Sequence, residues 1–146
     1  MRFDIALLAN RLNLATSWLA TLEDTCDLRV GYFGSSTGGG AALVAAAEQG
    51  EKIGAVVSRG GRPDLAREAL PRVMSPTLLI VGELDEAVIR LNEHAFNRLH
   101  CEKELAIVPG ASHLFEEGST LAEVARLAAR WFSRHLQPPR RAGNIL

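Results

Sequence analysis

Short apolar runs alternate along this chain with longer stretches in which apolar residues recur at steps of three and four. The short runs are rich in β-branched or aromatic residues, which predicts buried strands at 30–33, 53–57, 77–81 and 105–108. The longer stretches predict helices at 4–22, 37–47, 65–70, 87–99 and from 120 to the Pro138–Pro139 pair. A helix followed by repeated strand–helix units predicts an α/β fold, with a parallel sheet, right-handed crossovers and helices on both faces.

Local signals define the outer helices more closely. Asp4 is a candidate N-cap, and Thr120 and Glu123 have the spacing of a capping box. The first helix is expected to turn inward Ile5, Leu8, Leu12, Ala15, Leu19 and Leu22. The last helix is expected to pack through Leu121, Val124, Ala128, Trp131 and Phe132.

Composition places the chain among ordinary globular proteins. With 146 residues, 47% hydrophobic and 23% charged, we expect one domain over 1–137 and a loose tail over 138–146. A net charge of -1 gives no reason to expect a nucleic-acid or membrane partner. No apolar run approaches the roughly 18 residues that span a bilayer, and no signal pattern is seen, so we expect a cytoplasmic protein. Cys26 and Cys101 lack metal-type spacing and are expected to be reduced structural thiols, with no metal site.

The richest chemical signal lies between the first strand and the second helix. Residues 34–38, Gly-Ser-Ser-Thr-Gly, fit the pattern G-x-S-x-G with Ser36 at its centre. In that motif a strand turns sharply into a helix, the flanking glycines leave room for the turn, and the serine hydroxyl is exposed near unpaired N–H groups. A phosphate cradle is the alternative, but neither a following Lys-Ser/Thr nor G-x-G-x-x-G is present. A plain tight turn is the other alternative.

Two further residues follow strands at the same edge of the predicted sheet. Asp85 comes after the third strand and His113 after the fourth, and the carboxyl ends of parallel strands meet at one edge. Alone, each of these residues is more often a cap or turn residue. Together, in the chain order Ser, Asp, His, they predict a catalytic triad in which His113 takes the proton of Ser36 and Asp85 orients His113.

The loop after the second strand carries two arginines. Arg59 and Arg62 could clamp a substrate carboxylate or phosphate, because guanidinium groups suit planar oxyanions. The alternative is a solvated loop in which Asp64 is the local partner. The remaining charged residues near the site are expected to be solvated, and the other histidines to be structural or exposed: Glu83, Glu116 and Glu117; His94, His100 and His135.

Three segments carry a family resemblance: GYFGSSTGGGAALVAAA, SPTLLIVGELD and VPGASHLF. Together they resemble the C-terminal half of an α/β-hydrolase, in particular the dienelactone-hydrolase-like branch, over residues 4–136. The resemblance implies a truncated three-layer sandwich, with Ser36 as nucleophile, Asp85 as acid, His113 as base and no cofactor. Dienelactone hydrolases proper have a cysteine at the elbow, so Ser36 implies an esterase-like reaction on a small acyl substrate. Related domains also occur fused to phosphoribosyltransferases.

The resemblance also implies what these 146 residues lack. The backbone N–H of Thr37 would be one oxyanion donor, whereas the second normally comes from an earlier loop that this polypeptide does not contain. Strands before the first helix are missing too, which would leave a hydrophobic sheet edge; we expect association, most simply as a homodimer. Two hypotheses follow: a serine esterase, or a hydrolase-derived binding or assembly module that retains the triad residues.

Overall fold

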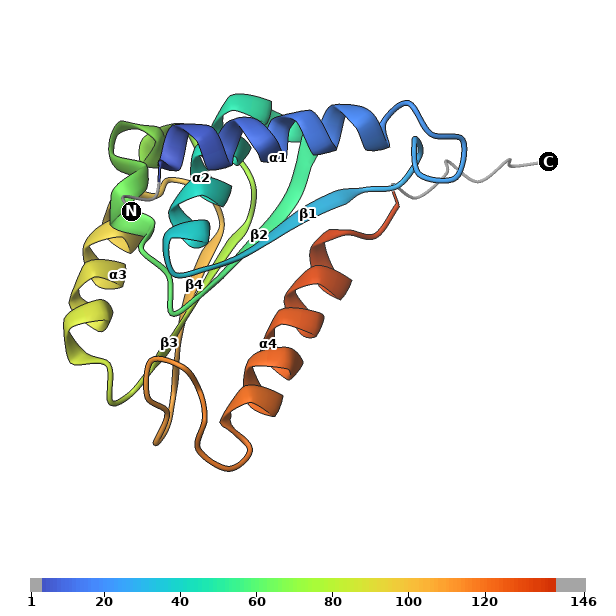
Figure 1. Ribbon diagram of the computed structural model, residues 1–146. Coiled ribbons are helices and arrows are strands. Elements are labelled where there is room, and N and C mark those ends of the chain that lie inside the picture. The colour runs from blue at the N-terminus through green and yellow to red at the C-terminus, as the bar shows by residue number, and fades with distance from the viewer. Residues whose placement is uncertain (1–3, 139–146) are drawn as a thin grey trace.

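Four parallel strands form the centre of the structure. The computed structural model describes residues 4–138 and places the strands side by side in chain order (Figure 1). They are β1 (Val30–Ser35), β2 (Ile53–Arg59), β3 (Thr77–Gly82) and β4 (Lys103–Val108). All three pairings are parallel, which confirms the predicted sheet. β2 runs two residues further than predicted, because Ser58 and Arg59 pair with Gly34 and Ser35 of β1.

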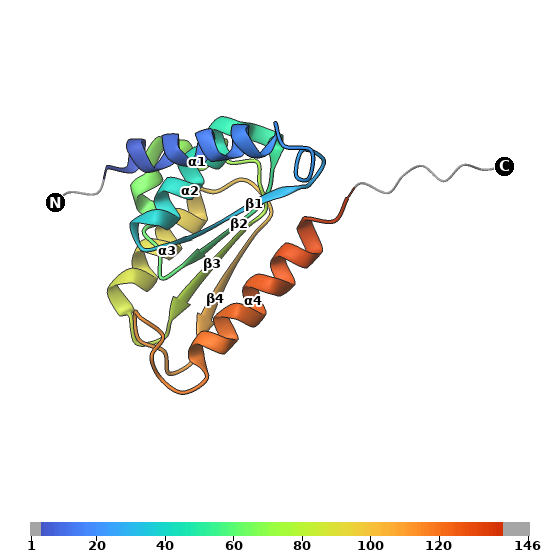
Figure 2. The ribbon, with the colours of Figure 1, turned by 45° about the vertical axis from the view of Figure 1, so that its right-hand side comes forward.

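Helices cover both faces of this sheet, so the fold has three layers, as predicted. Three helices and a 3-10 segment lie on one face, and α4 lies alone on the other (Figures 1 and 2). The elements are α1 (Ile5–Leu19), α2 (Thr37–Gln49), η1 (Gly50–Lys52), η2 (Pro63–Arg72), α3 (Glu86–Arg98) and α4 (Thr120–His135). The segment predicted as a helix over 65–70 lies within the 3-10 stretch η2. This stretch is interrupted at Arg67 (φ 45°) and contains Pro71, which lacks an N–H.

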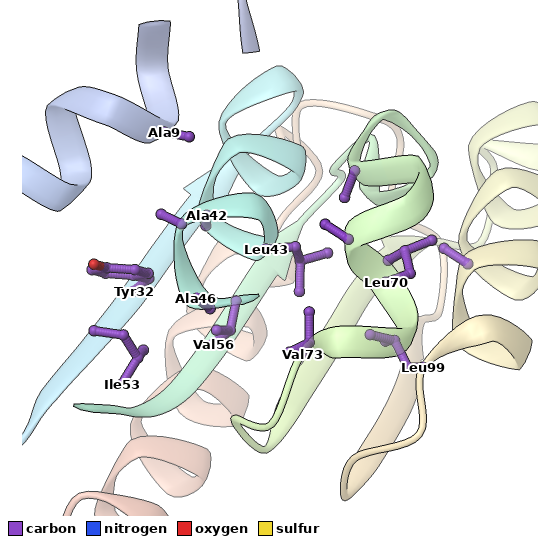
Figure 3. Close-up of a cluster of buried hydrophobic side chains, with 14 of the residues drawn as sticks. Ala9, Tyr32, Ala42, Leu43, Ala46, Ile53, Val56, Leu70, Val73 and Leu99 are labelled. Atoms are coloured by element: carbon purple, nitrogen blue, oxygen red, sulfur yellow. The ribbon is translucent and has the colours of Figure 1, made fainter. Parts of the chain in front are cut away.

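Small residues allow α2 to lie very close to the sheet. Its alanines and Leu43 pack with Tyr32, Ile53 and Val56 in the larger of two hydrophobic clusters (Figure 3). A Cβ at Gly39 would lie 2.3 Å from Ser58 Oγ, and a Cβ at Gly40 would lie 2.7 Å from the Arg62 carbonyl oxygen. The first turn of α2 is therefore held directly against the end of β2 and the loop that follows it.

The second cluster lies between the sheet and α4. Val124, Ala128 and Trp131 are buried there, as predicted, and the Trp131 indole N–H donates to the Pro76 carbonyl at 3.2 Å. Leu121 was expected to pack inward but is 53% exposed, because it lines an open groove with Phe33 and Arg59 at the start of α4.

The ends of the outer helices differ partly from the prediction. Asp4 does cap α1, since its carboxylate accepts from the Leu7 N–H at 3.1 Å. The inward face of α1 centres on Ala9 rather than the exposed Ala15, and Leu22 lies in a turn beyond the helix. The capping box is wrong: Ser119 is the N-cap of α4, without a side-chain cap bond.

The register of α4 explains why the capping box fails: Thr120 is already the first helical residue, so Glu123 lies one position beyond the one that a capping box uses. The Glu123 carboxylate binds the Arg126 guanidinium one turn further along α4, with Nε at 2.8 Å. It is therefore engaged away from the helix start, and the Thr120 hydroxyl is buried without a hydrogen-bond partner among residues 4–138.

Some expectations concern the chain's ends and environment. The predicted loose tail falls almost entirely on residues 139–146, which lie outside the described residues. Cys26 and Cys101 are both free thiols. Within residues 4–138, no helix combines the length and the apolar character that crossing a membrane requires.

Candidate active site

The turn from β1 into α2 holds Ser36 in a strained conformation. Ser36 has φ 51° and ψ -128°, a combination that a non-glycine residue rarely adopts, and its side chain is exposed. The turn needs glycine at 34, where a Cβ would lie 2.3 Å from the Gly38 carbonyl oxygen. It does not need glycine at 38, where a Cβ would meet nothing within 4 Å. The expectation that both flanking glycines provide room is thus correct only for Gly34.

Thr37 is the first residue of α2. Its N–H lies in the first turn, where backbone donors have no partner inside the helix and where the positive end of the helix dipole is found. The backbone around Ser36 thus offers a donor to an anion that forms next to the serine hydroxyl.

Asp85 and His113 are hydrogen-bonded across two loops. His113 Nδ1 lies 2.7 Å from Asp85 Oδ2, although 28 residues separate them in the chain. Asp85 follows β3 at the start of α3 and its side chain is 16% exposed, whereas the His113 side chain is 44% exposed. With Nδ1–H donating to the carboxylate, the neutral imidazole has its free lone pair on Nε2. This is the tautomer that a general base acting on a serine needs.

Ser36 and His113 flank the same loop without being hydrogen-bonded to each other. We call residues 60–62 the Gly60 loop. Its Arg62 N–H donates to the Ser36 carbonyl at 2.9 Å, and a Cβ at Gly60 would lie 3.3 Å from the His113 carbonyl oxygen. The Ser36 hydroxyl itself makes no hydrogen bond in the described part of the chain. In unliganded enzymes such bonds are often long and tighten only with substrate.

Two carboxylates hold the loop that carries His113. Glu83, just after β3, accepts from the Gly110 N–H at 2.7 Å, and Glu117 accepts from the Ser112 N–H at 3.0 Å and from its hydroxyl at 2.5 Å. The Ser112 hydroxyl, followed by its N–H, lowers the pKa of Glu117. Both glutamates were expected to be solvated. The one sequence feature that pointed to contacts at the site is their closeness to Asp85 and His113 along the chain.

The two arginines after β2 have different surroundings. Arg62 forms a bidentate pair with Asp64, with both N–O distances 2.9 Å, and this pairing raises the pKa of Arg62. The local partner foreseen for this loop is therefore present. Arg59 lies over the Phe115 ring, with 5.5 Å from its guanidinium carbon to the ring centre, and so stays next to the His113 loop.

Outside the candidate site, His135 is a structural histidine. His135 is 10% exposed and packs on Trp131 with ring centres 4.4 Å apart, and burial lowers its pKa. Across residues 4–138, no group of three or more His, Cys, Asp or Glu side chains is arranged to hold a metal ion.

Comparisons with known proteins agree with this fold. The model of the dienelactone hydrolase family matches residues 4–137. A crystal structure of dienelactone hydrolase from Anabaena variabilis is 61% identical with a TM-score of 0.92, over 94% of this chain and 63% of that one. The esterase domain of a Rhodothermus marinus protein shares the fold, with a TM-score of 0.73 at 18% identity, over 88% of this chain and 70% of that one.

Two Mycobacterium tuberculosis proteins, from strains CDC 1551 and H37Rv, are also similar. Each is called "Putative phosphoribosyl transferase" and is 57% identical over 141 residues, which is 97% of this chain. This chain spans 32% of the length of each, or about a third.

Acidification should release the Ser112 end of the His113 loop. The pKa of Glu117 is lowered in the folded state. The ionised Glu117 carboxylate therefore stabilises the fold fully above the ordinary glutamate pKa, and this stabilisation is lost as the pH falls through the lowered pKa. In an NMR titration we expect the Ser112 amide signal to move with a midpoint below the ordinary glutamate pKa, and Glu117→Gln to abolish this movement. A midpoint at or above the ordinary value would contradict the assignment.

Proposed function

This chain belongs to the dienelactone hydrolase family, and we propose that it acts as a serine hydrolase of the esterase type on a small ester or related acyl compound. The observation that carries the proposal is the Asp85–His113 hydrogen bond beside the strained Ser36. A carboxylate bonded to Nδ1 leaves Nε2 as the base, and the strained serine that shares the Gly60 loop with His113 is our candidate nucleophile.

The proposed reaction has two steps. Ser36 Oγ attacks the acyl carbon while His113 Nε2 takes its proton, and Asp85 stabilises the imidazolium that results. The Thr37 N–H donates to the oxygen that becomes negative. His113 then protonates the leaving alcohol, an acyl-enzyme remains on Ser36, and water activated by His113 releases the acid. No cofactor takes part in this scheme.

The name of the Mycobacterium tuberculosis relatives describes proteins of which this chain spans about a third. We therefore assign no phosphoribosyl transfer to this part. The G-x-S-x-G turn also lacks the lysine that a P-loop uses to bind phosphates.

A binding or assembly module remains the second candidate. Two observations favour it: Ser36 is not hydrogen-bonded to His113 here, and Thr37 is the one oxyanion donor that we assign at the turn. Loss of one oxyanion donor typically lowers the rate by about 100- to 1,000-fold. Covalent labelling, which needs only an activated serine, distinguishes the candidates better than turnover does.

Labelling with a fluorophosphonate should modify Ser36. We expect one adduct, which intact-protein and peptide mass spectrometry would place on Ser36, because an activated serine attacks phosphorus as it attacks an acyl carbon. Asp85→Asn should slow the labelling by roughly 10⁴-fold, because the imidazole then loses its tautomer and its counter-charge.

The neighbouring serine provides the matched control for this experiment. Ser35→Ala should still be labelled, whereas Ser36→Ala should not. A folded wild-type protein that stays unlabelled would reject the esterase and favour the module.

We also propose that Arg59 binds an anionic group of the substrate. Arg62 is engaged by Asp64, whereas the Arg59 guanidinium is held beside the His113 loop by Phe115 alone. With an active esterase, Arg59→Ala should raise the KM for a carboxylate-bearing ester by about 10-fold, since a charge-assisted hydrogen bond contributes roughly 1.5–3 kcal/mol. The KM for the neutral ester of the same alcohol is the control, and equal changes for both esters would count against the clamp.

The free edge of the sheet suggests self-association. Within residues 4–138, β1 pairs only with β2, so its other edge is free, and its Phe33 is 51% exposed. Beside it is a groove of about 380 Å³, lined by Leu8, Arg11, Leu12, Phe33, Gly34, Ser35, Gly38 and Ala41. By contrast, the other edge strand, β4, begins with Lys103 and Glu104, and charged residues discourage edge pairing. We propose that β1 is covered in a homodimer.

Sedimentation should reveal this dimer at micromolar concentration. Phe33→Lys should shift the equilibrium to monomer, since a charge on an edge strand opposes pairing. His94→Lys, on α3, adds the same charge away from this edge and serves as control. A wild-type protein that sediments as a stable monomer would rule out the dimer.

A further inference from the structure

The Gly60 loop connects parts of the site that are far apart in the sequence. Besides the bond from Arg62 to Ser36, the Gly60 N–H donates to the Ile80 carbonyl of β3 at 2.7 Å. Gly60 has φ +49° and faces His113 closely, with a would-be Cβ 3.5 Å from His113 Nδ1. A single short loop thus contacts the Ser36 turn, the strand that leads to Asp85, and His113.

A buried amide fixes this loop from the side. Asn92 is fully buried in α3, the helix that starts directly after Asp85. Its Nδ2 donates to the Gly61 carbonyl at 3.1 Å, 31 residues away, and to the Val88 carbonyl at 2.8 Å. Asn92 is therefore a direct link from the helix that follows Asp85 to the loop beside Ser36 and His113.

Tight packing leaves the loop little freedom on its other side. A Cβ at Gly61 would lie 1.8 Å from Ser58 Oγ, and the same hydroxyl crowds Gly39 in the first turn of α2. Gly61 is thus enclosed between β2, α2 and the Asn92 amide. A shift at Gly61 must pass to Arg62, whose N–H binds the Ser36 carbonyl.

Packing alone does not account for an asparagine at this position. Its Oδ1 is buried and has no hydrogen-bond partner among residues 4–138, which is unfavourable in an interior. Asparagine also favours a helix less than leucine does. A leucine of similar shape would avoid both disadvantages but could not donate to Gly61.

We propose that Asn92 is a positioning residue: by holding the Gly61 carbonyl it sets the Gly60 loop, and through it the placement of Ser36 relative to His113. Asn92 itself contacts none of the three residues. The proposal deepens, and rests on, the proposed function, but its geometric part can be measured independently of activity.

Hydrogen exchange at the Arg62 amide tests the geometric part directly. Asn92→Leu should speed exchange of this amide by about tenfold or more, because local opening becomes easier without the anchor. Amides of α2 and β3 should exchange as in wild type. Unchanged Arg62 exchange would overturn the proposal, whether or not the wild-type protein is active.

Fluorophosphonate labelling tests the functional part. Asn92→Leu should label Ser36 about 10- to 100-fold more slowly, since displacement of reacting groups by about 1 Å costs on the order of 10²-fold. With an ester substrate, kcat should fall while KM changes little, and Tm should change little, because the substitution removes an unpaired buried oxygen but also leaves the Gly61 carbonyl without its donor. Labelling at the wild-type rate would overturn the proposal, whereas failure of the wild type itself to label would reject the proposed function instead.

Two more variants complete the experiment. Asn92→Asp keeps the shape but, when ionised, has no donor for Gly61, so it should resemble Asn92→Leu in both assays. Thr77→Val removes a buried hydroxyl that donates to the Ser75 carbonyl at the start of β3, away from the Gly60 loop, and it should behave as wild type in both assays. If both Asn92 variants exchange faster throughout the chain, Asn92 is merely a core residue and the proposal is overturned.

Discussion

The reversal of the chain at Ser36 is the constraint on which the surrounding structure depends. A serine with φ 51° is held there because β1 and the first turn of α2 leave no room at Gly34 for a side chain. The same close approach explains the small residues that follow, since α2 can lie against β2 only with glycine at 39, and against the loop after β2 only with glycine at 40. Local strain at one residue is therefore maintained by packing along a whole helix.

The loops around this turn are held by polar contacts in addition to the buried Phe115 side chain. Glu83 and Glu117 bind backbone N–H groups of the His113 loop, and the Gly60 loop is bonded to Ser36 on one side and Asn92 on the other. Such contacts place a reactive group without enclosing it, which is consistent with a His113 side chain that is 44% exposed. Preorganised loops on a rigid sheet are a common basis for catalysis and for specific binding alike.

Asymmetry between the two faces of the sheet shapes the rest of the surface. Three helices and η2 cover one face, whereas α4 alone covers the other (Figure 2), and Phe33 of the edge strand β1 is 51% exposed. Family membership explains the layered core but leaves open what covers this edge. The carboxyl ends of the strands, with Ser36, Asp85 and His113, lie at the end of the sheet where parallel α/β proteins carry their chemistry.

The sequence by itself determined the strands, their parallel arrangement and the strand ends at which Ser36, Asp85 and His113 lie. These features follow from short-range patterns: apolar runs mark buried strands, and each of these residues comes just after one. Only the tertiary structure decided which polar groups meet, as in Glu83 with Gly110 or Asn92 with Gly61, because partners 27 and 31 residues apart leave no local pattern. It also decided where α4 begins: Ser119 rather than Thr120 is the N-cap, so Glu123 lies one position too far along the helix for a capping box.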